Sequence, residues 1–331
     1  MGAFSLRRIE LVTSLNELVG YKAGIALTHE QMCIPLSDED SNLFKGEVDA
    51  RLRVRSEHFA ELLARLLYSV GNIKSPDAMP GFFSLEDKFK HDKILFPIYC
   101  RVNNHLLNTI EEAMDSPVDF DQFLKWAAHA CGPQGAKIAQ IIIETLEEDR
   151  HKSPLIPFRR FEWKNVEELN NLFNSEQFKT PHGEFFDQRY IDYLSHNFES
   201  VDAINWRQFE GLTCEFFHRL GLKVEIGKGR NDDGIDARIW AKDPSAKTPL
   251  LLVQCKRQKD SIEKVVVKAL YADILQENAK AGLVVTTHRL SPGARQVCSG
   301  RNYPVAEANR DTLRAWVNAM RTPYSGIFLG E

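Results

Sequence analysis

The chain has 331 residues, of which 43% are hydrophobic, enough for two domains with cores of their own. No apolar run reaches the about 20 residues of a membrane-spanning helix, so we expect no membrane association. Six cysteines without metal-ligand spacing and ten histidines without helical pairs predict reduced thiols and no zinc site. The segment from Met1 to Gly20 carries four charged residues, so we expect no secretory leader and a cytoplasmic protein.

Charge is distributed unevenly along the sequence. Residues 201–331 contain 20 lysines and arginines against 15 acids, whereas the other 200 residues contain 22 against 31. A basic part joined to an acidic part is typical of a domain that faces nucleic acid and is attached to a second module.

The first 150 residues predict an all-α domain. Apolar residues recur at helical spacing from Phe59 to Val70. Further helices are expected at Leu6–Val19, Ser84–Met114, Phe120–Cys131 and Ala136–Glu147, with a loop at Cys33–Ser41. Two interpretations of this domain stay open. It is either an interaction or oligomerisation domain, or a sensor or DNA-targeting module.

Residues 151–183 predict a linker and a bridging helix, because Pro154 and Pro157 interrupt helices and stiffen the chain. Residues 184–331 predict a further domain. After a lead-in helix at 185–196, its elements follow the order α-β-β-β-α-β-α-β-α. Strands are expected at 222–226, 235–241, 249–256, 281–287 and 303–308. This order predicts an α/β fold in which helices flank a mixed sheet.

Two of these strands bring polar residues together. The simplest link between them is an antiparallel hairpin whose turn centres near Ser245, which places Asp236 opposite Gln254. Lys256 lies two residues further on and shares the face of Gln254, while Cys255 points the other way. On the preceding helix, Glu210 neighbours the apolar stripe and can face the sheet.

Such a patch suits the hydrolysis of phosphodiesters. Mg²⁺ prefers hard oxygen ligands, which Asp236, Gln254 and Glu210 can supply. A bound ion acts as a Lewis acid and lowers the pKa of a bound water. Lys256 can orient or deprotonate that water, or pair with the developing charge.

A resemblance to a known family rests on three strings, which are Phe209-Glu210, Asp233-Gly234-Ile235-Asp236 and Val253-Gln254-Cys255-Lys256. Together they resemble the Mrr-type restriction endonuclease domain of the PD-(D/E)xK nuclease superfamily, over about residues 190–317. The resemblance implies that Asp236 binds metal, that Lys256 is the catalytic lysine and that Glu210 is the helix-borne acid. Gln254 stands where most of the superfamily has an acid, although glutamine is usual in the Mrr branch. The lower charge leaves the number of metal ions open.

The resemblance implies a Mg²⁺-dependent endonuclease acting on double-stranded DNA, with Mn²⁺ as an alternative ion, in a restriction or anti-phage defence system. Two alternatives stay open. The chain could be a catalytically silent DNA-binding scaffold, or a nuclease effector gated by a partner or signal through residues 1–150. Those residues could also form a homo-oligomer or bind a defence-system partner.

Individual residues also have plainer interpretations. Asp236, Gln254 and Lys256 could form a structural polar cluster, and Glu210 could be a surface acid of its helix. Near the next helix start, His288, Arg289 and Ser291 are candidate contacts to DNA phosphates, because helix N-termini bind phosphate. An ordinary strand-to-helix loop explains them as well.

Overall fold

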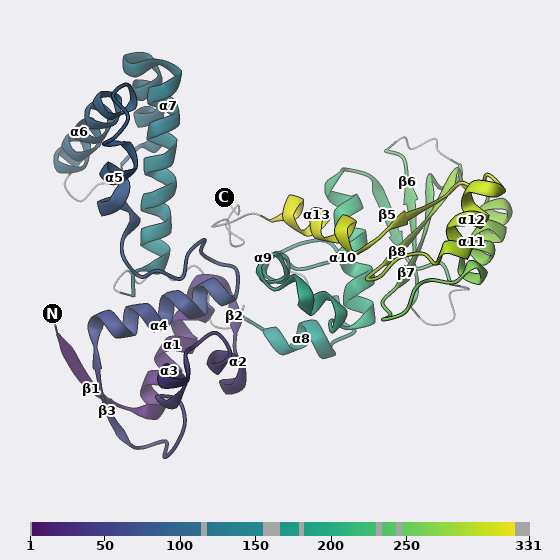
Figure 1. Ribbon diagram of the computed structural model, residues 1–331, viewed down its shortest axis with the longest axis horizontal. Helices are drawn as coiled ribbons and strands as arrows, with labels where there is room; N and C mark the ends of the chain where they lie inside the picture. The colour runs from purple at the N-terminus through teal and green to yellow at the C-terminus, as the bar shows by residue number, and fades with distance from the viewer. Residues whose placement is uncertain are drawn as a thin grey trace.

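The computed structural model describes residues 2–113, 118–154, 166–178, 182–229, 234–242 and 247–321. Figure 1 shows a mostly helical N-terminal region and, apart from it, a C-terminal sheet flanked by helices. No helix within these ranges is both long and apolar enough to cross a membrane. All six cysteines are free thiols, as the sequence predicts.

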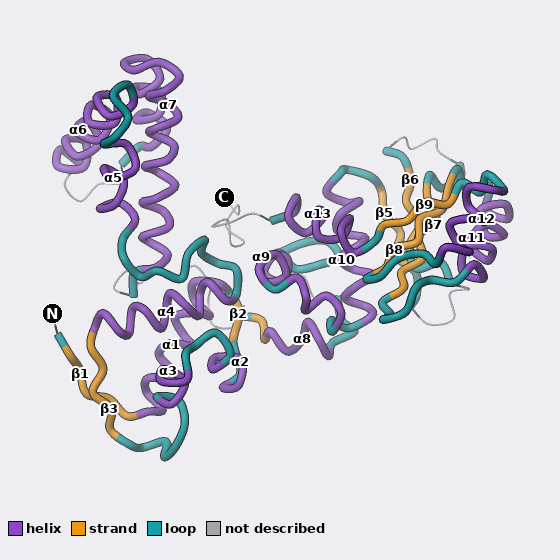
Figure 2. Tube along the Cα trace, viewed as in Figure 1, coloured by secondary structure: helices purple, strands orange, loops and turns teal. Residues whose placement is uncertain are grey.

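Residues 2–73 form four helices and three short strands (Figure 2). The helices are α1 (Arg8–Ala23), α2 (His29–Cys33), α3 (Asp38–Asn42) and α4 (Ser56–Ser69). The strands β1 (Ala3–Arg7) and β3 (Arg51–Arg55) pair antiparallel, and β2 (Ile25–Ala26) pairs in parallel with β4 (Glu167–Glu168). The predicted helical character is confirmed, but the region is not exclusively α.

The missed strands have a local cause. Residues 51–55 alternate arginine with an apolar residue, and this period of two exposes the arginines while Val54 is buried. The predicted loop at Cys33–Ser41 is also wrong in part. Ser37 caps α3 by accepting a hydrogen bond from the Asp40 backbone N–H at 3.1 Å.

A separate helical hairpin follows, with a hydrophobic cluster of its own. It consists of η1 (Gly81–Ser84), α5 (Leu85–Phe89), α6 (Leu95–Ala113) and α7 (Phe120–Lys152). Gly132 adopts a φ of 67° and interrupts α7 just before Pro133. This break falls between the two helices that the sequence predicts at 120–131 and 136–147.

The C-terminal region contains a five-stranded sheet of order β5-β6-β7-β8-β9. Its strands are β5 (Lys223–Ile226), β6 (Ala237–Trp240), β7 (Leu251–Lys256), β8 (Ala281–Thr286) and β9 (Val305–Ala308). Strands β5 to β7 are antiparallel neighbours, whereas β7 to β9 run parallel. The helices are α8 (Leu169–Asn174), α9 (Gln188–His196), η3 (Phe198–Asp202), α10 (Trp206–Arg219), α11 (Lys264–Glu277), α12 (Pro292–Gly300) and α13 (Arg310–Met320). The predicted mixed sheet and its element order are confirmed.

The central strand β7 is covered on both faces. Val253 belongs to the hydrophobic cluster that contains Phe209 and Leu212 of α10. Leu252 points the other way and joins the cluster of α11 and α12. The uninterrupted apolar run before Gln254 is therefore a strand buried on both sides, as such runs indicate.

The N-terminal region and the C-terminal region share one hydrophobic cluster. Buried Arg189 of α9 also donates from Nη1 to the Gly24 carbonyl at 2.9 Å, and Asn197 Nδ2 donates to the Ser69 carbonyl at 2.7 Å. The short helix α8 lies where a bridging helix is predicted, whereas residues 155–165 and 179–181 of the linker lie outside the described residues. Domain boundaries at 151 and 184 stay a prediction.

Candidate active site

The hairpin of β6 and β7 has the predicted register. Ala237 pairs with Val253 and Ile239 with Leu251. Continued by one residue, this register sets Asp236 beside Gln254. Arg238 forms a salt bridge with Glu277 of α11, so even-numbered residues of β6 face the α11 side. Leu252 of β7 faces that side too, which places Gln254 and Lys256 there by alternation.

Asp236 is fixed by its own backbone and by its side chain. Its N–H donates to the Val253 carbonyl at 2.9 Å, and its carbonyl accepts from Gly227 N–H at 2.7 Å. Its Oδ2 accepts a hydrogen bond from the Cys255 N–H at 2.6 Å. Only 7% of the residue is exposed, so the carboxylate occupies a defined position at the end of the hairpin.

Glu210 reaches the same place from α10. Asn205 caps this helix by accepting from the Arg207 N–H at 2.8 Å, and Glu210 falls on the buried face, 5% exposed. The interpretation of Glu210 as a surface acid is therefore wrong. Arg207 Nη1 donates to Glu210 Oε2 at 2.6 Å, and its Nη2 donates to the Gly227 carbonyl at 2.8 Å.

Glu210 and Asp236 form a coupled carboxyl pair. Burial chiefly, and then the charge of Asp236, raises the pKa of Glu210 to about 8, although Arg207 acts in the opposite direction. A hydrogen bond between the two carboxyl groups contributes to the increase. At neutral pH without metal, the pair therefore holds one proton, since two neighbouring carboxylates in a dry site resist ionising together.

Gln254 carries an oxygen without a hydrogen-bond partner at the strand position next to Asp236 in the hairpin register. The residue is 8% exposed, and its Oε1 has no hydrogen-bond partner among the described residues. Gly234, with a φ of +85°, leaves room for this side chain, because a Cβ there would lie 2.9 Å from Gln254 Nε2. An unbonded buried amide oxygen carries a free-energy penalty unless a ligand or water satisfies it.

Lys256 ends β7 on the same face and is partly exposed. Within the described ranges its ammonium makes no hydrogen bond or ion pair. The charge is therefore available to a substrate or a water.

The donor set fits a hard divalent cation. Asp236 and Glu210 supply carboxylate oxygens and Gln254 supplies the unbonded Oε1, which are the ligand types that Mg²⁺ accepts. Among the described residues no group of three or more His, Cys, Asp or Glu could hold a metal ion. The third donor here is an amide. Asp232 and Asp233 lie outside the described residues.

The candidate phosphate contacts separate into two kinds. His288 and Arg289 line a cavity of 430 Å³ together with Lys259 and Arg295. Ser291 is 6% exposed, and it caps α12 by accepting from the Ala294 N–H at 3.2 Å. His288 and Arg289 therefore lie at this cavity, whereas the hydroxyl of Ser291 serves as the N-cap of α12.

Three further residues of the site region, Arg207, Lys259 and Arg295, were not among the predicted ones. The position of Arg207, three residues before Glu210, is the helical spacing at which opposite charges meet, so a signal was present. For Lys259 and Arg295 there was none, because Lys259 lies on the loop after β7 and Arg295 on α12, and only the fold brings them together. A bridge between Ile262 and Leu290 joins these loops.

The raised pKa of Glu210 predicts a pH-dependent stability of the metal-free protein. The unfolded carboxyl titrates near 4.5 and the folded one near 8, so the folded state holds a proton that the unfolded chain loses between these values. The stabilisation is complete below pH 4.5 and is lost as the pH rises through 8. The test compares the Tm of the unsubstituted chain with that of Glu210→Gln in EDTA. The difference, unsubstituted minus variant, should become smaller as the pH rises from 5 to 9. A difference that stays constant would contradict the shift.

Comparison with known proteins assigns the class. Residues 201–317 match the family model Mrr_cat, described as restriction endonuclease. The C-terminal part of this chain is therefore similar to restriction endonuclease domains, as the resemblance to the Mrr type predicts, and this similarity supports a nuclease.

A search of solved structures found the MspJI restriction endonuclease in complex with a 27-mer oligonucleotide. The two chains share 19% identity with a TM-score of 0.28, over 42% of this chain and 34% of that one. The match thus spans about a third of that protein. No curated protein matches this chain.

Proposed function

We propose that this chain is a Mg²⁺-dependent endonuclease that hydrolyses phosphodiester bonds of double-stranded DNA in a restriction or anti-phage defence system, with Mn²⁺ as a substitute ion. The observation that carries the proposal is the buried Glu210–Asp236 pair, together with Gln254 Oε1, which is next to Asp236 in the hairpin register and has no hydrogen-bond partner among the described residues. Lys256, whose ammonium has no partner among the described residues, lies on the strand face of Gln254. The family match to residues 201–317 supports the same reaction class.

Each residue has a distinct task in this proposal. Asp236 binds the cation with a carboxylate that the Cys255 N–H holds in place. Glu210 would hold the cation in its ionised form, and Arg207 orients that carboxylate. Gln254 adds an oxygen without adding charge. A bound divalent cation would neutralise phosphate charge and supply a water of lowered pKa. Lys256 orients that water or stabilises the charge that develops on the phosphate.

We further propose that residues 184–331 form the catalytic unit and that residues 1–150 direct targeting or assembly. That assembly is either a homo-oligomer or a complex with a defence-system partner. Support comes from the position of all four site residues within the C-terminal region and from the separate hydrophobic cluster of the α5–α7 hairpin.

The test uses the purified full chain and supercoiled plasmid. We expect nicked or linear DNA in Mg²⁺ or Mn²⁺ and intact plasmid in EDTA. Binding without cleavage in either ion would contradict the proposal and favour a silent scaffold. Cleavage that appears only after a cellular partner or ligand is added would instead favour a gated effector.

Gln254→Glu should keep cleavage and bind Mg²⁺ at least as tightly as the unsubstituted chain. The change adds the charge that Mg²⁺ prefers in a ligand, at the position of an oxygen that has no competing hydrogen bond. The measurement is the Mg²⁺ concentration at half-maximal cleavage, taken at pH 8.5 so that the neighbouring Glu210 can ionise. Gln258→Glu, on the exposed loop after β7, adds the same charge as a control. A higher Mg²⁺ concentration at half-maximal cleavage in Gln254→Glu, but not in Gln258→Glu, would count against Gln254 as a ligand.

A further inference from the structure

An arginine-rich β-ribbon lies in the N-terminal region, away from the candidate active site. Strands β1 and β3 pair so that Ser5 is opposite Arg53 and Ala3 is opposite Arg55. Alternate residues share a face, so Arg51, Arg53 and Arg55 project from the same side of the ribbon, and all three are exposed. The small side chains opposite two of them leave the guanidinium groups uncovered.

The opposite face of the ribbon is anchored, which fixes the direction of the arginines. Val54 is 2% exposed, and Leu52 packs against the main hydrophobic cluster. Phe4 makes an edge-to-face contact with Phe59 of α4 at 5.6 Å between ring centroids. Because a one-residue slip would bury the arginines, this packing specifies the register.

The three arginines of β3 are less engaged than Arg7, whose hydrogen bonds chiefly lower the pKa of Glu10, although the charge of Arg51 also contributes to that lowered pKa. Arg7 on β1 forms salt bridges with Glu10 and Asp49. By contrast, Arg51, Arg53 and Arg55 make no hydrogen bond or salt bridge in the described parts of the chain. Three neighbouring unpaired guanidinium groups repel one another, so the arrangement gains stability from a bound anion.

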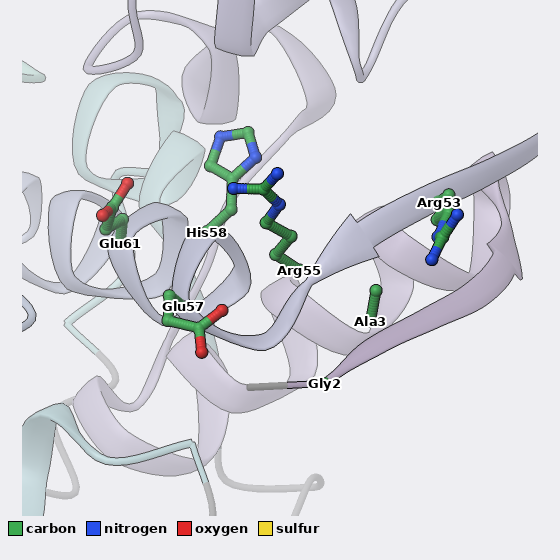
Figure 3. Close-up of a pocket in the computed structure, with 7 residues that line it drawn as sticks. All are labelled: Gly2, Ala3, Arg53, Arg55, Glu57, His58 and Glu61. Atoms are coloured by element: carbon green, nitrogen blue, oxygen red, sulfur yellow. The ribbon is translucent and has the colours of Figure 1, made fainter.

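A cavity of 710 Å³ adjoins this face (Figure 3). Arg53 and Arg55 line it from the strand, and Glu57, His58 and Glu61 line it from α4. The carboxylates of Glu57 and Glu61 would repel a polyanion on the α4 side of this cavity. The attractive surface is therefore the exposed face of β3 itself.

The spacing of the arginines fits a nucleic-acid backbone. Strand residues rise about 3.3 Å each, so alternate side chains lie about 6.6 Å apart. Each phosphate of one DNA strand rises about 3.4 Å along the helix axis and is also rotated around it, so neighbouring phosphates lie about 6 to 7 Å apart, nearly the same spacing. Arginine binds phosphate through a planar fork of donors, and a two-stranded ribbon is narrow enough to follow a groove of B-DNA.

We propose that the β1–β3 ribbon is a second DNA-binding surface, which contacts the phosphates of a duplex through Arg51, Arg53 and Arg55. This inference rests on the proposed function, because it assumes that the substrate is duplex DNA. Figure 1 shows β1 and β3 at the other end of the molecule from β6 and β7. The ribbon therefore holds a segment of duplex at a distance from the bond that is cut.

The test measures binding without cleavage. The affinity of a 40-bp DNA duplex is determined in EDTA over a range of salt concentrations, for the full chain and for the triple variant R51Q/R53Q/R55Q. The slope of log K against log salt is negative, and each lost phosphate contact reduces its magnitude by about 0.9. We expect the magnitude of the slope to fall by about 2 to 3 and the affinity to fall on the order of 10- to 100-fold near physiological salt.

A charge-matched control removes the same number of positive charges from the α5–α7 hairpin. The variant K93Q/K125Q/K137Q replaces three exposed lysines and should leave the slope nearly unchanged. The single variant R53Q, which should lower the magnitude of the slope by about 1, serves if the triple variant has a reduced Tm. An unchanged slope in folded R51Q/R53Q/R55Q, or an equal loss in the control, would overturn the inference. Plasmid cleavage in Mg²⁺ is scored separately, so failure of the proposed function would be recognised on its own.

Discussion

Asp236→Ala should abolish plasmid cleavage, with a loss of about 10³-fold or more, the upper range for removing one charge-stabilising group. Asp236 supplies a carboxylate to the proposed cation and also accepts the Cys255 N–H. Alanine leaves that buried N–H unsatisfied, which costs stability as well. Asp236→Asn removes the charge but keeps an acceptor oxygen. It should therefore lose cleavage to a similar extent with a smaller change in Tm.

The measurement is the initial rate of plasmid nicking at saturating Mg²⁺, with thermal unfolding in parallel. Asp311→Ala, at the exposed start of α13, removes a carboxylate from the same domain and should cleave normally. Near-normal cleavage by a folded Asp236→Asn protein would disprove the site.

Lys256→Ala and Lys256→Arg should both lose cleavage, by about 10²-fold or more. The ammonium of Lys256 has no partner among the described residues and lies on the strand face that carries Gln254. A lysine that only held a phosphate could be replaced in part by arginine, because both carry a positive charge. A lysine that orients a small water molecule needs a compact amine, for which the planar, bulkier guanidinium is a poor substitute.

Binding and cleavage must be compared to separate these roles. Cleavage is measured in Mg²⁺ and affinity in Ca²⁺, which can occupy an oxygen site. We expect affinity to fall much less than cleavage. Lys264→Ala and Lys264→Arg, at the exposed start of α11, are the matched controls. Equal losses of binding and cleavage would indicate that Lys256 only binds a phosphate. Normal cleavage by Lys256→Arg would contradict a role for Lys256 in orienting or deprotonating the water.

The sheet and the register of its central hairpin could be predicted because their signals are local. An apolar run before Gln254, a turn-rich segment and an alternating strand are enough to set Asp236 beside Gln254. The β1–β3 ribbon was missed because its partners are far apart in the sequence and its arginine alternation is short. The strand β1 also lies where a helix from Leu6 was expected, although α1 begins at Arg8.

Other properties of the site depend on tertiary packing. The sequence places Glu210 near an apolar stripe, but only the docking of α10 on the sheet brings its carboxyl against Asp236 and raises its pKa. The free Oε1 of Gln254 likewise follows from what surrounds it, including the left-handed Gly234. The spacing of Arg207 and Glu210 did carry a signal for their hydrogen bond, whereas the cavity beside His288 could not be derived from residue spacing.

The central claim is that one divalent cation site lies between Asp236, Gln254 and Glu210. The most direct measurement is the anomalous difference density of crystals soaked with Mn²⁺ at pH 8.5, where Glu210 can release its proton. Our account predicts a peak within bonding distance of an Asp236 carboxylate oxygen and of Gln254 Oε1. A peak elsewhere, or none at an Mn²⁺ concentration that supports cleavage in solution, would contradict it.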